Sequence, residues 1–192
     1  MTTTRKKSAT KSATKRNGSA KQATALLKEQ HRKVEGLFKQ IEGARSRKED
    51  LVTELANDLA GHMKIEQEIF YPRVRQLDED LVLESFEEHS IAEVALKRLL
   101  DTSPEEETFD ARVTVLKELI LHHVEEEEKS LFPKVDKKLD AAESEQLASE
   151  MKAMFDDAVA EGYESILPEG TETTSSDIAE QRVLEAPMAA HH

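Results

Sequence analysis

Apolar residues recur at steps of three and four along five segments of the chain, the spacing that keeps side chains on one face of an α-helix. Helices are predicted at about residues 23–41, 49–71 and 78–100, with a fourth that meets Pro133 and a fifth after Asp140. Short connections make neighbouring helices antiparallel. The pattern predicts an all-α fold, an up-down-up-down four-helix bundle with an additional C-terminal helix and disordered termini.

Capping residues and prolines predict where three of these helices begin or end. Ser103 followed by Pro104 combines a capping residue with a first-turn proline, which favours a start of the fourth helix there. Asp140 and Glu143 have the spacing of a capping box at the start of the fifth helix. Pro72 is expected to kink or end the second helix, because proline lacks the N–H that a helix needs.

Polar residues interrupt the apolar stripe of each of the first four helices. They are His31 on the first, His62 and Glu66 on the second, His89 and Glu93 on the third, and His123 and Glu127 on the fourth. Each histidine lies about 20 Å along its helix from the neighbouring loops, so all four are expected at one level of the bundle. Buried carboxylates need compensating positive charge. Their convergence with four imidazoles predicts a metal site.

The composition limits the chemistry of this site. The chain has no cysteine, which excludes disulfides, thiolate zinc sites, iron–sulfur clusters and cysteine nucleophiles. Imidazole and carboxylate ligands suit iron, with manganese as an alternative. No apolar run has the length of a membrane span or the character of a signal-peptide core, so a cytoplasmic protein without a membrane partner is expected.

Charge is distributed unevenly along the chain. Residues 1–22 hold seven basic residues and no acidic one, whereas the remainder holds 20 basic and 40 acidic residues, a net charge of −20. Such an acidic body does not favour nucleic acid. Residues 1–22 are interpreted as a disordered tail that is a solubilising segment, a weak anion-binding arm or a targeting peptide. The bundle with its fifth helix is assigned to residues 23–162, and residues 163–192 to a disordered acidic tail.

The chain also repeats itself. The sequence HMKIEQEIFYP from His62 matches HVEEEEKSLFP from His123, each with glutamate four and proline ten residues after the histidine. Likewise EQHRKVE around His31 matches EEHSIAE around His89. The repeat predicts one helical hairpin used twice, with each copy contributing ligands to a shared, pseudo-symmetric site.

These motifs resemble those of the hemerythrin-like HHE cation-binding domains over about residues 22–135. The resemblance implies a carboxylate-bridged pair of iron ions (Fe²⁺/Fe³⁺) with an oxo or hydroxo bridge, which reacts with dioxygen or peroxide. It further implies terminal ligation by the four histidines and bridging by the two matched glutamates. The terminal ligands are then His31, His62, His89 and His123, and the bridging carboxylates are Glu66 and Glu127.

Glu93 departs from the oxygen carriers of this family, which have a histidine at its position. For Glu93 two roles are predicted as alternatives: it binds a metal ion directly, or it only hydrogen-bonds a histidine that does. The departure brings the site nearer to variants associated with iron or oxygen sensing and oxidative stress. The alternatives are an enzyme that removes peroxide or nitric oxide, with an electron donor that the sequence does not identify, and a metal-free interaction module.

One competing register is present on the fourth helix, where His122 and Glu126 repeat the spacing of His123 and Glu127. The stripe that contains them is more polar and lacks the ten-residue spacing to proline. His122 is therefore interpreted as a surface residue. The other glutamates of the 125–128 run are interpreted as a solvated face.

Overall fold

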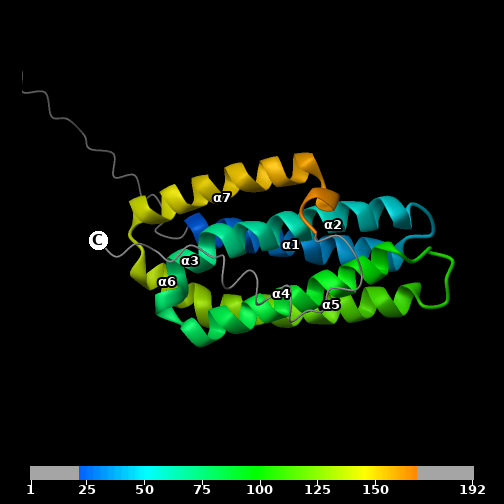
Figure 1. The fold of residues 1–192 in the computed structure, drawn as a ribbon, viewed down its shortest axis with the longest axis horizontal. Coiled ribbons are helices and arrows are strands. Elements are labelled where there is room, and N and C mark those ends of the chain that lie inside the picture. The colour runs from blue at the N-terminus through cyan, green and yellow to red at the C-terminus, as the bar shows by residue number, and fades with distance from the viewer. Residues whose placement is uncertain (1–21, 168–192) are drawn as a thin grey trace, which may run out of the picture.

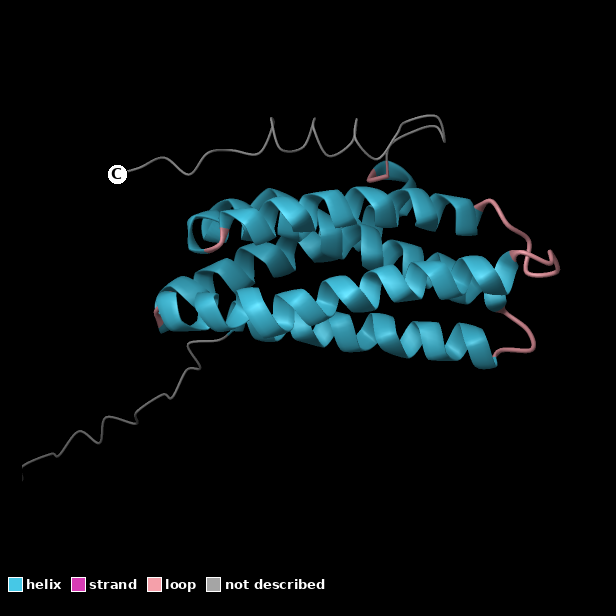
Figure 2. Ribbon diagram, turned by 90° about the horizontal axis from the view of Figure 1, so that it is seen from below, coloured by secondary structure: helices cyan, strands magenta, loops and turns pink. Residues whose placement is uncertain are grey.

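Long helices packed side by side make up the computed structural model, which describes residues 22–167 (Figure 1). They are α1 (Gln22–Gly43), α2 (Lys48–Ile65), α4 (Glu79–Leu100), α5 (Phe109–Glu126) and α7 (Ala141–Glu161). The first four form two antiparallel hairpins, α1–α2 and α4–α5, whose loops lie at the same end of the bundle (Figure 2). The predicted four-helix bundle with an additional C-terminal helix is confirmed.

Both α2 and α5 continue into a wider, π-helical turn. These turns are η1 (Glu66–Phe70) and η3 (Glu127–Leu131), followed by the short helices α3 (Tyr71–Val74) and α6 (Phe132–Lys138). The Tyr71 N–H donates to the carbonyl of Glu66, five residues back, so the turn before Pro72 has one residue more than an α-helical turn. Pro72 therefore does not end the second helical segment, which runs on to Val74 and a 3₁₀ turn, η2 (Arg75–Leu77).

The fourth helix begins later than predicted. Residues 101–108 form turns, in which the Ser103 N–H donates to Glu106 Oε1 at 2.9 Å, and α5 begins at Phe109. The acidic run between these residues has no apolar side chain to bury, whereas Phe109 is 1% exposed and packs in the core. Burial of Phe109 therefore outweighs the capping potential of Ser103 in setting the helix start.

The fifth helix, α7, packs against α1 and α2. It begins with the predicted capping box, in which Asp140 accepts from the N–H groups of Ala142 and Glu143. Gly61 on α2 allows the close approach, since a Cβ atom there would lie 3.2 Å from a ring carbon of Phe155. Among the described helices, none is long and apolar enough to cross a bilayer.

The C-terminal tail does not begin at residue 163 as expected. A 3₁₀ turn, η4 (Tyr163–Ser165), follows α7. After it Leu167 is buried, because its side chain packs on apolar residues of the hairpins. The rest of the expected acidic tail and residues 1–21 of the basic tail lie outside the described residues.

The buried interior contains two hydrophobic clusters. One includes Val34, Phe38, Leu59 and Ile120, on the side of the hairpin loops, and the other includes Leu27, Ile65, Phe70, Val82 and Phe132. The polar residues of the four stripes lie along the helices between these two sets. The fold therefore places a buried polar layer between two apolar regions.

Candidate metal centre

The four predicted histidines lie in one layer as two close pairs. Nε2 of His31 on α1 is 3.2 Å from Nε2 of His62 on α2, and Nε2 of His89 on α4 is 2.9 Å from Nε2 of His123 on α5. All four side chains are buried. Each hairpin thus supplies one pair of imidazoles, as the sequence repeat predicts.

Two buried glutamates lie between the pairs, each at the first position of a π-helical turn. Glu66 Oε2 is 3.2 Å from His62 Nε2 and 3.4 Å from His89 Nε2. Glu127 Oε2 is 3.3 Å from His31 Nε2 and 3.7 Å from His123 Nε2. Each carboxylate therefore reaches one histidine of either hairpin, the placement that a bridging ligand requires.

Ligand atoms from these residues come together in two groups that share Glu66. One group contains His31, His62, Glu66 and Glu127, and the other contains Glu66, His89 and His123. Within the described part of the chain, both oxygens of Glu66 and Oε2 of Glu127 are buried and accept no hydrogen bond. Buried carboxylate oxygens without a donor are costly. A pair of cations fits this arrangement.

The Nδ1 atoms of the first pair are held by side chains that the sequence analysis missed. His31 Nδ1 donates to Glu128 Oε1 at 2.9 Å, and Arg32 also binds that oxygen. His62 Nδ1 donates to Gln30 Oε1 at 2.8 Å. Because these oxygens can only accept, the neutral form of each imidazole has its lone pair on Nε2, and the two Nε2 atoms face each other. The interpretation of Glu128 as part of a solvated face is wrong.

The second pair also has partners at Nδ1, but one bond runs in the other direction. His123 Nδ1 donates to Glu88 Oε2 at 2.7 Å, whereas His89 Nδ1 accepts from the side-chain amide nitrogen of Gln67 at 3.1 Å. In the sequence repeat Glu88 matches Gln30, and Glu128 matches Gln67. The repeat could have identified these partners, since matched residues contact Nδ1 of matched histidines in both halves.

The pKa values of the buried groups shift in different directions: burial lowers that of His123, but nearby carboxylates, Glu127 first, outweigh this effect and raise it above 6.5. Burial, then repulsion from His31 and His123, lowers the pKa of His62 well below 6.5, so its imidazole is neutral. Burial, then repulsion from Glu127, raises the pKa of Glu66 well above 4.5. Burial acts likewise on Glu127, but His123 and His31 outweigh it and lower its pKa. Of the two carboxylates, Glu66 therefore holds a proton more readily in the metal-free protein.

A tyrosine hydroxyl enters the layer beside the second pair. Tyr71, the first residue of α3, is fully buried, and its hydroxyl donates to Glu127 Oε1 at 3.1 Å. The same oxygen lies 3.3 Å from His89 Nε2 and 3.4 Å from His123 Nε2. Burial, together with the Glu127 and Glu66 carboxylates, raises the pKa of Tyr71 well above 10.0. The sequence analysis quoted this residue only as part of a motif.

Two other candidates from the sequence, Glu93 and His122, do not belong to these groups of ligand atoms. Glu93 is buried one turn after His89 but belongs to neither group of ligand atoms around the four histidines, so its role as a metal ligand stays a prediction. His122 has a 65% exposed side chain and lies 3.8 Å from Glu88 and 3.9 Å from Glu126. Its interpretation as a surface residue is confirmed.

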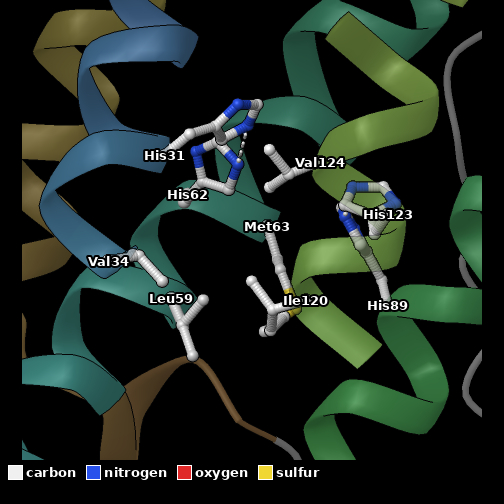
Figure 3. A pocket seen from close by; sticks show the side chains of 9 residues that line it. All are labelled: His31, Val34, Leu59, His62, Met63, His89, Ile120, His123 and Val124. Carbon is white, nitrogen blue, oxygen red and sulfur yellow. Dashed lines mark hydrogen bonds between the residues drawn. The ribbon is translucent and has the colours of Figure 1, made fainter. Parts of the chain in front are cut away.

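A small apolar cavity of about 10 Å³ adjoins the four histidines. Besides the imidazoles it is lined by Val34, Leu59, Met63, Ile120 and Val124, and the two histidine pairs lie on either side of it (Figure 3). A cavity of about 10–15 Å³ holds one water molecule. The site therefore borders a small space with room only for a ligand of very few atoms.

Comparison with known proteins also indicates a helical metal-binding domain. The Hemerythrin HHE cation binding domain model matches residues 22–135, and the chain belongs to this family. The crystal structure of an HHE domain-containing protein from Mycobacterium kansasii is 25% identical, with a TM-score of 0.67, and the match covers 82% of this chain and 97% of that one.

A second relative is a protein named DNA nickase from Nostoc sp. (strain PCC 7120). It is 30% identical over 131 residues, which make up 67% of this chain. The match spans only 37% of the nickase, so the shared part is one portion of a longer protein.

Proposed function

We propose that this is a non-haem di-iron protein whose ligand is dioxygen or peroxide, with a role in iron or oxygen sensing or in the oxidative-stress response. The observation that carries the proposal is the set of three buried carboxylate oxygens without donors among four imidazoles. His31 and His62 would hold one ion, His89 and His123 the other, and Glu66 and Glu127 would be shared. A bound pair of iron ions supplies redox chemistry toward dioxygen or peroxide.

The donor set favours iron over zinc. Two shared carboxylates and four imidazoles supply about eight of the roughly twelve positions of two six-coordinate ions, which leaves positions for solvent and a small ligand. Structural zinc sites have four ligands and are closed. Manganese, which takes similar ligands, is the competing metal.

The protein itself orients the ligands and excludes water. Gln30, Glu128, Glu88 and Gln67 hold the Nδ1 side of the imidazoles, so each Nε2 is aimed at the layer. The apolar lining of the cavity keeps bulk water from the histidines and limits the size of the ligand.

Anaerobic reconstitution of the full chain with ferrous iron, followed by metal analysis, tests the proposal. About two iron ions per chain are expected, and fewer in Glu127→Gln, whereas Glu125→Gln, on the exposed part of the same run, should match the wild type. One ion per chain, or preferential zinc binding, would overturn the di-iron assignment. Adding peroxide or nitric oxide then separates a binding protein from an enzyme, because only an enzyme consumes more than a stoichiometric amount.

A further inference from the structure

The pseudo-symmetry of the site is broken at one matched pair of residues. Nine residues after the histidine, the first repeat has Tyr71 and the second has Phe132. Both rings are fully buried, and each packs on one imidazole, Tyr71 on His89 at 5.6 Å and Phe132 on His31 at 5.8 Å between ring centroids. The two aromatic residues therefore hold equivalent places, but only one carries a hydroxyl.

The position of that hydroxyl matches a ligand position. Metal bonds to nitrogen and oxygen of about 2.0–2.2 Å place neighbouring ligand atoms about 3.0–3.5 Å apart. Tyr71 Oη lies 3.3 Å from His89 Nε2, 3.4 Å from His123 Nε2 and 3.1 Å from Glu127 Oε1. The oxygen thus stands at ligand spacing from three donor atoms at once.

We propose that Tyr71 binds the metal ion held by His89 and His123 as a phenolate, so that the two metal positions are chemically different. The proposal rests on the proposed function, since it needs an occupied site. On binding, the phenolic O–H bond breaks, an oxygen–metal bond forms, the proton leaves to the buffer and no electron is transferred. An anionic oxygen ligand favours the ferric state, so the position beside Tyr71 would be the more readily oxidised one.

The composition makes this assignment unusually easy to test. A phenolate bound to ferric iron gives a visible charge-transfer band with resonance-enhanced Raman modes of the ring. The chain has two tyrosines, Tyr71 and Tyr163, and neither tryptophan nor cysteine. Any such band must therefore come from one of two residues, and Tyr163 lies in η4 outside the metal layer.

The experiment compares the oxidised, iron-loaded full chain with two variants. The band is expected in the wild type and in Tyr163→Phe, and it should be lost in Tyr71→Phe, which keeps the buried ring and matches the native Phe132. Iron content and thermal unfolding of each variant are measured on the same samples, so a lost band is distinguished from lost iron or lost fold.

Three outcomes would overturn the proposal. If the wild type binds two iron ions without the band, the Tyr71 hydroxyl only hydrogen-bonds Glu127. If the band persists in Tyr71→Phe, another group is its source. If no iron binds at all, the proposed function fails, and the ligand assignment fails with it.

Discussion

Gln30 on α1 holds His62 on α2, with 2.8 Å between Gln30 Oε1 and His62 Nδ1. The equivalent pair in the second hairpin, Glu88 and His123, is 2.7 Å apart. In both hairpins the residue just before one histidine of the layer fixes the ring of the other. Such a partner sets the tautomer and orientation of a ligand imidazole before any metal arrives.

Removing one of these partners should weaken metal binding without abolishing it. For Gln30→Leu we expect a loss of about 10–100-fold in affinity, the usual effect of removing a hydrogen-bond partner of a ligand histidine. Competition with a chelator measures the change. Gln40→Leu, on the exposed face of the same helix, is the matched control. Equal affinity of the two variants would show that the Gln30 contact is unimportant.

Titration of Glu66 should make the metal-free protein less stable as the pH rises. The pKa of Glu66 is raised above 4.5 in the folded state, so its contribution to stability is fully present below about pH 4.5 and is lost as the pH rises through the folded-state pKa. Glu66→Gln should remove this contribution and stabilise the metal-free protein at neutral pH by about 1–3 kcal/mol.

Urea unfolding of the two metal-free proteins over a range of pH measures this difference, with the exposed Glu68→Gln as control. With iron present the wild type should be the more stable of the two, because the variant lacks the Glu66 carboxylate that would bind the metal. A wild type and a Glu66→Gln variant with parallel pH profiles would contradict the assignment of the buried proton.

Glu93→Gln should keep both metal ions. Glu93 is buried but lies outside the two groups of ligand atoms around the histidines, and the amide keeps its shape. Metal analysis of Glu93→Gln beside Glu127→Gln checks this, since only the second is expected to lose iron. Loss of one ion from Glu93→Gln would make Glu93 a ligand and would support the departure from the oxygen carriers inferred from the sequence.

Filling the apolar cavity should slow the reaction with dioxygen or peroxide. Val34→Leu adds one methylene to the lining, at a cost in stability of about 1–3 kcal/mol, while the iron content should not change. Val52→Leu makes the same change at a buried position that does not line the cavity. Stopped-flow absorbance compares the two. Equal rates would mean that the ligand reaches the metals by another route.

The fold and the layer of buried histidines and glutamates were predictable because both depend on periodicity. Steps of three and four give the helices, and residues that break an apolar stripe must share its buried face. The Nδ1 partners escaped this logic, since Gln30 and Glu88 lie one residue off the stripe and reach sideways to a neighbouring helix. The start of α5 escaped it because burial of Phe109 outweighed a local capping signal.

The π-helical turns were not predictable from the apolar periodicity or from capping residues and prolines. A wider turn has no periodicity of its own over five residues, and the proline after it was expected to stop the helix. In the structure the wider turn lets the helix continue through Pro72 and Pro133 while Glu66 and Glu127 lie at its first position. In the sequence, the ten-residue spacing from histidine to proline, which occurs in both repeats, marks the position of this turn.

The exchange of partners between the two hairpins has a consequence for folding. Glu128 of the second hairpin holds His31 of the first, and Gln67 after the first hairpin holds His89 of the second. Each half can therefore preorganise only one of its two imidazoles by itself, however well its two helices pair. A metal ion captured by one hairpin alone would be held loosely, and tight binding has to wait until the halves have docked. Metal affinity thus depends on docking, and the free energy of metal binding would in turn stabilise the docked arrangement.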